Sequence, residues 1–254
     1  MKKNKKLLTI ITVVKNDELN IEKTIKSIIS QKNNEVEYII VDGNSRDNTT
    51  KLVKKYKNKI DKILVKKDKG IYDAMNNGIL HSSGKYVGFC NSGDIIRDHS
   101  LKIILKFLKQ NIDVLFATVK RNYLGGYIIK SGFSLKRLLY NFDFATSHTT
   151  GFYVKKSIHK MIGYYDIKFK CSSDYDFYLR LFKNNDILIK STPKNKIIGE
   201  VKSGGFSSTF TPLQHLNEET KIRIKNNQNY ILICIIYLNT LIKICLKKLN
   251  NIFK

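Results

Sequence analysis

The chain has 254 residues, of which 42% are hydrophobic, with only 2 prolines and 14 glycines. This length and composition suit a folded domain with appendages and exclude an intrinsically disordered chain. The formal charge of +25 comes from 46 lysines and arginines against 21 acidic residues. Because the lysines are spread out and no basic region is interleaved with aromatic residues, we expect no specific nucleic-acid partner. An anionic membrane surface is the better candidate.

The cysteines and the amino terminus bear on the compartment. None of the 4 cysteines forms a Cys-x-x-Cys pair or a zinc-like spacing, so we expect reduced thiols and a cytoplasmic protein. The apolar run at residues 7–14 is short, and it ends in Lys15-Asn16-Asp17 without a small-residue cleavage site. We therefore interpret it as a buried first strand and not as a signal peptide.

The first 120 residues alternate strand and helix signals. Apolar runs predict strands at residues 7–14, 38–41, 60–65, 86–90 and 113–118. Apolar residues at helical spacing predict helices at residues 19–31, 49–56, 71–80 and 101–109. This order predicts the α/β class, with one Rossmann-like, mostly parallel sheet covered by helices on both faces. No Gly-x-Gly-x-x-Gly follows the first strand, which disfavours a dinucleotide oxidoreductase.

The second half of the chain is less regular. Residues 121–210 are expected to complete the same domain, so the predicted boundaries are a domain at 1–210 and a helical C-terminal extension at 211–254. Residues 230–246 are almost wholly apolar and lead into Lys247 and Lys248. This stretch falls short of the roughly 20 residues that span a bilayer. It either packs on the domain or lies in a membrane interface with its lysines at the headgroups.

Five polar segments recur after predicted strands or before helices. Residues 42–49 read Asp-Gly-Asn-Ser-Arg-Asp-Asn-Thr, and residues 68–76 read Asp-Lys-Gly-Ile-Tyr-Asp-Ala-Met-Asn. Asn-Ser-Gly-Asp follows the buried strand at residues 91–94. Ser-Asp-Tyr-Asp-Phe-Tyr-Leu-Arg stands at 173–180, and Gly-Gly-Phe-Ser-Ser at 204–208. Open α/β sheets bind their ligands at the carboxyl ends of the strands, where the first and third of these segments lie.

Taken in order, these segments resemble family-2 glycosyltransferases with the GT-A fold, over about residues 7–210. The resemblance implies an inverting hexosyl- or N-acetylhexosaminyltransferase that uses a nucleoside-diphosphate sugar, which we expect to be UDP-linked. It further implies a saccharide acceptor, lipid-linked, in the assembly of surface polysaccharide or lipooligosaccharide. With the basic, apolar C-terminus, it predicts a cytoplasmic enzyme, peripheral on the cytoplasmic face of the inner membrane.

The resemblance assigns the donor to polar residues of the first half of the chain. Asp42 would accept hydrogen bonds from the base, or it forms the turn before Gly43. Asp73 and Asn76, three residues apart, share a helix face and either line the donor pocket or are solvated. The predicted donor-binding residues are Asn16, Asp42, Asp68, Gly70, Asp73, Asn76, Asn91 and Ser92.

The predicted metal position departs from the family pattern. Many members carry Asp-x-Asp-Asp, whereas residues 91–94 keep only Asp94 as a carboxylate. Mg²⁺ or Mn²⁺ works with one or two carboxylates and phosphate oxygens, so Asp94 alone suffices for a metal-dependent enzyme. The alternative for Asp94 is a cap or turn residue.

The resemblance places the catalytic base at Asp174, where Ser173 replaces the usual preceding Glu. An inverting transfer needs a carboxylate that takes the proton of the acceptor hydroxyl. Asp176 is expected to be supporting or structural, and Arg180 either stabilises this segment or reaches a phosphate. His148 lies near the acceptor or is structural, and Gly205 allows close backbone approach or makes a turn.

Two rival functions stay open. A catalytically reduced family member would bind a nucleotide sugar or a partner without transfer, as the depleted 91–94 segment suggests. A basic nucleic-acid-binding protein is the remote alternative and rests on charge alone.

Overall fold

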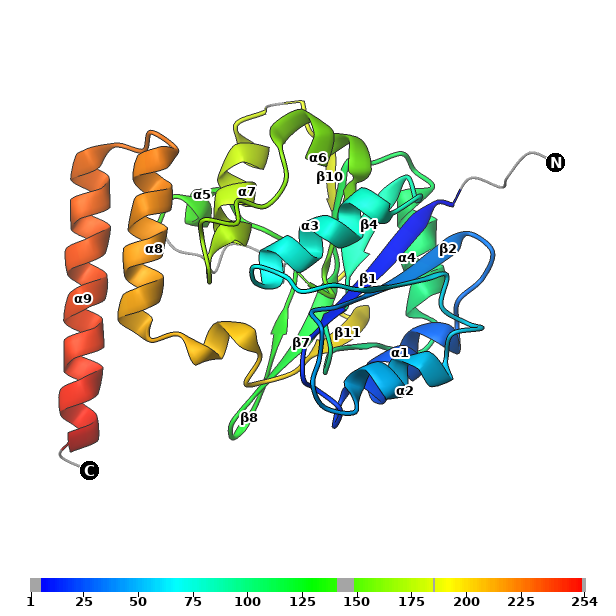
Figure 1. The fold of residues 1–254 in the computed structure, drawn as a ribbon. Helices are drawn as coiled ribbons and strands as arrows, with labels where there is room; N and C mark the ends of the chain where they lie inside the picture. Colours follow the sequence, from blue (N-terminus) through cyan, green and yellow to red (C-terminus); the bar gives the residue numbers. More distant parts are fainter. Residues whose placement is uncertain (1–5, 141–148, 185, 253–254) are drawn as a thin grey trace.

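The computed structural model describes residues 6–140, 149–184 and 186–252. Strands and helices alternate through the first part of the chain, close to their predicted bounds (Figure 1). These elements are β1 (Leu8–Val14), α1 (Ile21–Ile29), β2 (Val36–Asp42), α2 (Thr49–Lys55), β3 (Lys62–Val65), α3 (Ile71–His81), β4 (Tyr86–Phe89), β5 (Ile95–Ile96), α4 (Ser100–Leu108) and β6 (Val114–Phe116).

The later elements are short strands, five α-helices and one 3₁₀ turn within the described residues. They are β7 (Thr118–Tyr123), β8 (Gly126–Lys130), α5 (Leu135–Leu138), β9 (Phe152–Lys155), α6 (Lys156–Ile162), α7 (Ser173–Phe182), β10 (Ile189–Ser191), β11 (Ile197–Val201), the 3₁₀ turn η1 (Phe206–Thr209), α8 (Pro212–Lys225) and α9 (Tyr230–Ile252).

The main sheet has seven strands in the order β10-β6-β9-β4-β1-β2-β3. Strands β1, β2, β3 and β4 pair in parallel, whereas β9 is antiparallel to both β4 and β6. The prediction of a large, mostly parallel sheet flanked by helices is therefore confirmed. Because their carboxyl ends share one edge, the loops after β1, β2, β3 and β4 come together there.

A second sheet corrects the prediction of a single sheet. Strands β5, β11, β7 and β8 form it, in that order. The predicted strand at residues 113–118 is split in two, because β6 ends at Phe116 in the main sheet and β7 begins at Thr118 in the second. The second sheet places β11 beside the carboxyl edge of the main sheet, since Lys202, directly after β11, contacts Asp94.

The core lies on both faces of the main sheet. Successive residues of β1 point to opposite faces, so Ile11 packs in the cluster with α3 and α7, and Ile10 packs in the cluster with α1 and α4. All seven residues of β1 are buried. A strand covered on both faces is apolar throughout, which explains its continuous sequence signal.

Helices α8 and α9 form an antiparallel pair at one side of the molecule (Figure 1). Thr211 and Gln214 cap α8 reciprocally, and Pro212 occupies its first turn. Helix α9 is longer than the predicted 230–246 stretch, and by length and composition Tyr230–Lys247 could cross a membrane. Only 6% of that window is buried. The predicted boundary at residue 210 stays a prediction, although α8 also packs against α7.

Candidate active site

Two loops at the carboxyl edge of the sheet are bound to each other through Asn16. Its side-chain Oδ1 accepts the N–H of Arg46 at 2.8 Å, and its own N–H donates to Ser45 Oγ at 2.9 Å. Asn16 has a positive φ of 50°, which Asn tolerates better than most residues. It thereby fixes the loop after β1 against the loop after β2.

Asp42 ends β2 with a fully buried carboxylate. Its Oδ1 accepts from Ser45 N at 2.9 Å and from Ser45 Oγ at 2.7 Å, and its Oδ2 accepts from the Thr50 hydroxyl. The carboxylate therefore organises its own loop, the turn-forming role named as the alternative above. Contact of Asp42 with a donor base stays a prediction.

Asp68 lies in a cradle that only glycine at position 43 permits. A Cβ on Gly43 would overlap the Asp68 carboxylate and lie 3.1 Å from Lys15 Cδ. Lys15 Nζ is 3.6 Å from Asp68 Oδ1, and Gly70 N–H donates to the same oxygen at 3.2 Å. The cradle brings a carboxylate and an ammonium together at the carboxyl edge of the sheet, and contact of Asp68 with a donor stays a prediction.

The start of α3 places Gly70 and Asp73 together. Gly70 precedes the helix with a φ of 134°, which L side chains rarely adopt. The Asp73 carboxylate, in the first turn of the helix, accepts the N–H of Lys69 at 3.0 Å and so fixes the turn before α3. Both residues line the pocket described below.

Asn76 is placed differently from its prediction as a donor-pocket residue. Its Nδ2 donates to the Tyr165 carbonyl at 2.8 Å, and its Oδ1 accepts the Tyr165 N–H at 3.0 Å. Because both ends of the amide bind the backbone of Tyr165, the structure turns Asn76 toward the protein and not toward a ligand. It fixes the segment that leads to α7.

The loop at residues 91–94 follows β4 at the same edge. Asn91 Oδ1 is buried and has no hydrogen-bond partner within the part of the chain that the structure describes. Ser92 Oγ donates to Asp17 Oδ2 at 2.7 Å. Gly93 has a φ of 93°, and a Cβ there would meet Lys202 Cδ at 2.6 Å. A buried acceptor without a hydrogen-bond partner costs free energy of folding. Asn91 Oδ1 is therefore the atom of this loop best suited to bind a ligand.

Asp94 is a buried carboxylate fixed from two sides. Its Oδ1 accepts the N–H of Lys202 at 3.0 Å, and its Oδ2 accepts from Thr150 Oγ1 at 3.1 Å. No group of three or more His, Cys, Asp or Glu side chains that could hold a metal occurs among the described residues. The oxygen chemistry of Asp94 fits a Mg²⁺ or Mn²⁺ whose other ligands are water and phosphate, because such ions need only one or two carboxylates.

Asp174 lies in the first turn of α7 and is almost fully buried. The Tyr72 hydroxyl donates to its Oδ1 at 3.0 Å, and the Tyr175 N–H donates to the same oxygen at 3.1 Å. Burial and the neighbouring Asp174 charge raise the pKa of Tyr72 well above its usual value. Tyr72 therefore stays protonated and donates its hydroxyl hydrogen bond to the Asp174 carboxylate.

Asp176 and Arg180 form a buried ion pair in α7, the helix that carries the predicted base. Arg180 Nε donates to Asp176 Oδ2 at 2.8 Å, and the Arg180 guanidinium also binds the Gly163 carbonyl at 3.1 Å and the Tyr164 carbonyl at 2.8 Å. Asn226 of α8 donates to Asp176 Oδ1 at 3.0 Å. Since these contacts are all internal, both side chains stabilise the α7 segment in this structure.

Two predicted residues remain, His148 and Gly205. His148 is outside the described residues. Gly205 is exposed directly before η1, and its carbonyl accepts from Ser208 N at 2.9 Å. A Cβ on Gly205 would meet nothing within 4 Å, so glycine is not needed there for space.

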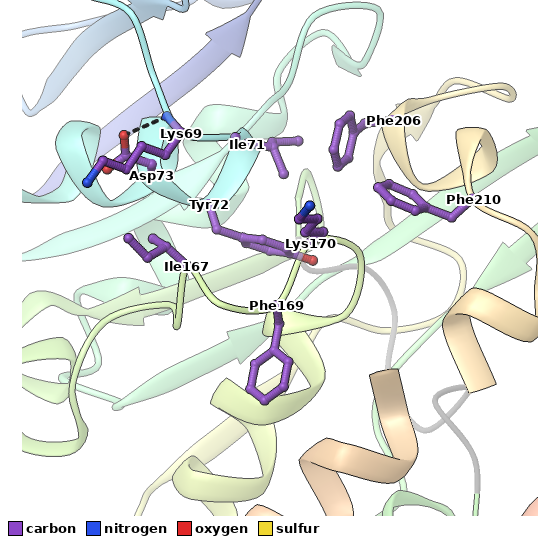
Figure 2. Close-up of a pocket in the computed structure, with 10 residues that line it drawn as sticks. Lys69, Ile71, Tyr72, Asp73, Ile167, Phe169, Lys170, Phe206 and Phe210 are labelled. Carbon is purple, nitrogen blue, oxygen red and sulfur yellow. Dashed lines mark hydrogen bonds between the residues drawn. The ribbon is translucent and has the colours of Figure 1, made fainter. Parts of the chain in front are cut away.

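A cavity of about 190 Å³ lies in front of Tyr72, between the start of α3 and η1 (Figure 2). Its lining residues are mainly aromatic and aliphatic, with two lysines and one carboxylate. They are Lys69, Gly70, Ile71, Tyr72, Asp73, Ile167, Phe169, Lys170, Phe206 and Phe210. Because Tyr72 both lines this cavity and binds Asp174, it connects the cavity to the predicted base.

Sequence reasoning missed two residues that fix Asp174 or the turn before it. Tyr72 stands inside the quoted 68–76 segment, but its spacing alone does not indicate a partner 102 residues away. Glu218 of α8 accepts the N–H groups of Lys170, Cys171 and Ser172, at 2.6, 2.7 and 2.8 Å. No local pattern marks Glu218, because its partners belong to a turn distant in sequence.

The comparisons with known proteins show the family of this chain and confirm the predicted GT-A fold. The sequence profile of glycosyl transferase family 2 matches residues 9–165, more than half of the chain. The chain belongs to this family and is a glycosyltransferase. A PGL/p-HBAD biosynthesis glycosyltransferase of Mycobacterium tuberculosis is 25% identical over an alignment of 213 residues that covers 79% of this chain and 80% of the relative. An uncharacterized glycosyltransferase of Rickettsia bellii is 34% identical over 89 residues, 35% of this chain and 13% of that protein.

Two solved structures share the fold. TarS of S. aureus, in complex with UDP-GlcNAc, superposes with a TM-score of 0.70 at 21% identity, over 92% of this chain and 71% of TarS. The mannosyltransferase PcManGT of Pyrobaculum calidifontis, in complex with GDP-Man and Mn²⁺, gives a TM-score of 0.62 at 12% identity, over 91% of this chain and 67% of that chain. At these identities the likeness concerns the fold alone.

Proposed function

We propose that this glycosyltransferase transfers a sugar from a nucleoside-diphosphate sugar, UDP-linked, to a saccharide acceptor with inversion at the anomeric carbon. The observation that carries the proposal is the buried Asp174 carboxylate, which accepts a hydrogen bond of 3.0 Å from Tyr72. Tyr72 in turn lines the cavity. The UDP-GlcNAc bound to TarS supports the donor class, because TarS shares the fold of this chain.

In this proposal Asp174 acts as the general base. It takes the proton of the acceptor hydroxyl while that oxygen attacks the anomeric carbon and the nucleoside diphosphate leaves. A single displacement of this kind inverts the configuration. Tyr72 is a positioning residue, because its hydrogen bond fixes Oδ1 of Asp174 and leaves the orientation of the carboxylate defined.

We also propose that Asp94 holds a Mg²⁺ or Mn²⁺, with the diphosphate of the donor providing other ligands. A bound divalent ion would offset the negative charge of the leaving group. Two observations support the proposal. Asn91 Oδ1, in the same 91–94 loop as Asp94, is buried without a partner among the described residues, and the PcManGT complex contains Mn²⁺.

The acceptor proposed here is a lipid-linked saccharide at the cytoplasmic face of the inner membrane, in cell-surface glycan synthesis. The largely unburied apolar helix α9 supports a membrane-surface position. The name of the mycobacterial relative, a PGL/p-HBAD biosynthesis glycosyltransferase, supports a role in a biosynthetic pathway.

The test uses UDP-GlcNAc, UDP and GDP with and without Mn²⁺. UDP at about 100 times its dissociation constant should stabilise the protein by about 2.7 kcal/mol in a melting experiment. Asp174→Asn should slow donor turnover by roughly 10²-fold or more and retain UDP binding, because the amide cannot accept the proton. The matched control is Asp98→Asn, which changes an exposed carboxylate outside the site and should be neutral.

Each other outcome points to a different function. UDP binding without turnover by the unmodified protein would favour the catalytically reduced family member. Unchanged turnover in Asp174→Asn would assign the base elsewhere. Absence of a melting shift with every nucleotide would refute the nucleotide-sugar proposal.

A further inference from the structure

The cavity that Tyr72 lines combines aromatic walls with a cation. Figure 2 shows Lys170 directed into the space between Tyr72, Phe206 and Phe210, whereas Lys69 extends away from it, beside Asp73. Within the described residues, Lys170 Nζ forms no ion pair or side-chain hydrogen bond. The one carboxylate that lines the cavity, Asp73, accepts the N–H of Lys69 on the other side of α3's start.

The walls of this cavity are fixed before any ligand binds. The Phe206 and Phe210 rings pack edge to face with centroids 5.3 Å apart, and Phe210 packs on His215 at 6.0 Å. His215 of α8 also bonds the Ser207 carbonyl at 2.9 Å through Nε2. Glu218 of the same helix fixes the backbone of Lys170 through its N–H at 2.6 Å. Helix α8 thus holds the aromatic wall and the backbone of Lys170, which lowers the conformational entropy that binding must remove there.

The shape and chemistry suit one sugar ring with an acidic group. A volume of about 190 Å³ is below that of a pocket for a drug-sized ligand. The apolar C–H face of a sugar packs well on aromatic rings such as Phe206, which is 43% exposed at the cavity. Lys170 itself is exposed, so its ammonium can meet an anion that enters from solvent, and the attraction is strongest at low salt.

We propose that this cavity is the acceptor subsite and that Lys170 binds a carboxylate or phosphate carried by the acceptor sugar. The proposal rests on the proposed function, because it takes Asp174 as the base that Tyr72 connects to the cavity. It names the acceptor class as acidic saccharides, with Lys170 as a specificity-determining residue.

The experiment compares probe pairs that differ in one acidic group. These are p-nitrophenyl β-D-glucuronide against p-nitrophenyl β-D-glucoside, and glucose 6-phosphate against glucose, with UDP present and affinities measured by ligand-observed NMR. In the unmodified protein at low salt, at least one acidic probe should bind about fivefold or more tightly than its neutral twin. The carboxylate and phosphate pairs separate the two sources of the anion.

Variants then assign the preference to Lys170. Lys170→Gln should abolish the preference and Lys170→Arg should keep it, whereas Lys168→Gln removes an exposed charge of the same loop outside the cavity and should change nothing. Equal binding of both twins, binding of no probe, or a preference that survives in Lys170→Gln would overturn the proposal. Failure of the proposed function is distinguishable, because it would appear as loss of UDP binding in the unmodified protein.

Discussion

The Tyr72 hydroxyl donates a hydrogen bond of 3.0 Å to Oδ1 of Asp174, across 102 residues of sequence. Tyr72 belongs to the first turn of α3 and Asp174 to the first turn of α7, so this contact joins the two halves of the domain at the cavity. The proposed donor residues come from the loops after β1 to β4, whereas the proposed base comes from α7. In this proposal the bond between Tyr72 and Asp174 is where the donor half and the acceptor half of the site meet.

Tyr72→Phe tests this bond directly. The variant keeps the ring, which packs on Tyr165 with centroids 5.7 Å apart, and removes the proton donor to the carboxylate. A hydrogen bond to a charged group contributes about 1.5 kcal/mol or more, so we expect sugar transfer to slow by about tenfold or more. Steady-state kinetics of transfer, with UDP affinity measured in parallel, provide the readout.

Tyr165→Phe is the matched control for Tyr72→Phe. The Tyr165 hydroxyl is buried without a hydrogen-bond partner among the described residues, so its removal should leave transfer unchanged and stability equal or higher. Equal losses in the two variants would mean that Tyr72 acts through core packing and not through Asp174.

Much of the main sheet was predictable, because β1 and β4 are buried on both faces and read as continuous apolar runs. Polar residues after those strands indicated the predicted donor edge, because the carboxyl ends of parallel strands meet at one edge of the sheet. The second sheet was not predictable, since β5 has two residues and much of β8 is exposed, which leaves no periodic signal. The surroundings of Asp174 were also hidden, because Tyr72 and Glu218 reach the α7 segment only after folding. The amide of Asn76 could not be assigned from its helix face, since its partner is a backbone segment 89 residues away.

Glu218→Ala should loosen the turn that carries Lys170 into α7. Three successive backbone N–H groups donate to this carboxylate, and removing the carboxylate leaves all three without that acceptor. Bonds to a charged acceptor are among the stronger ones, so we expect a loss of about 2 kcal/mol or more in the free energy of unfolding. Hydrogen exchange should accelerate at residues 170–172. Glu218→Gln, which keeps one oxygen, should show a smaller effect, and equal exchange in all three proteins would contradict this role.

His159 predicts an acid sensitivity of the fold. The ring is fully buried against Tyr164 and Phe177, and burial lowers the pKa of His159 from 6.5 to about 3. Below pH 6.5 the unfolded chain binds a proton that the folded chain does not, so stability falls as the pH drops from 6.5 toward 3. At pH 5 this linkage costs about 2 kcal/mol relative to neutral pH. Denaturant unfolding at pH 7 and pH 5 measures it, and His159→Phe should reduce the pH dependence. A variant with the full pH dependence would assign it to other groups.

The outer face of α9 predicts binding to anionic vesicles. Ile231, Ile235, Leu238, Ile242 and Leu246 are each more than half exposed and recur at helical spacing, while Lys243 and Lys247 flank them. Burying one isoleucine contributes about 1.5–3 kcal/mol, so Ile235→Ser with Ile242→Ser should weaken binding to phosphatidylserine vesicles by tenfold or more. Asn239→Ser on the same helix is the control and should bind like the unmodified protein in a sedimentation assay. If the double variant binds equally well, the face has another occupant. A dimer of the unmodified protein that the double variant dissociates would identify that occupant as a second copy of the chain.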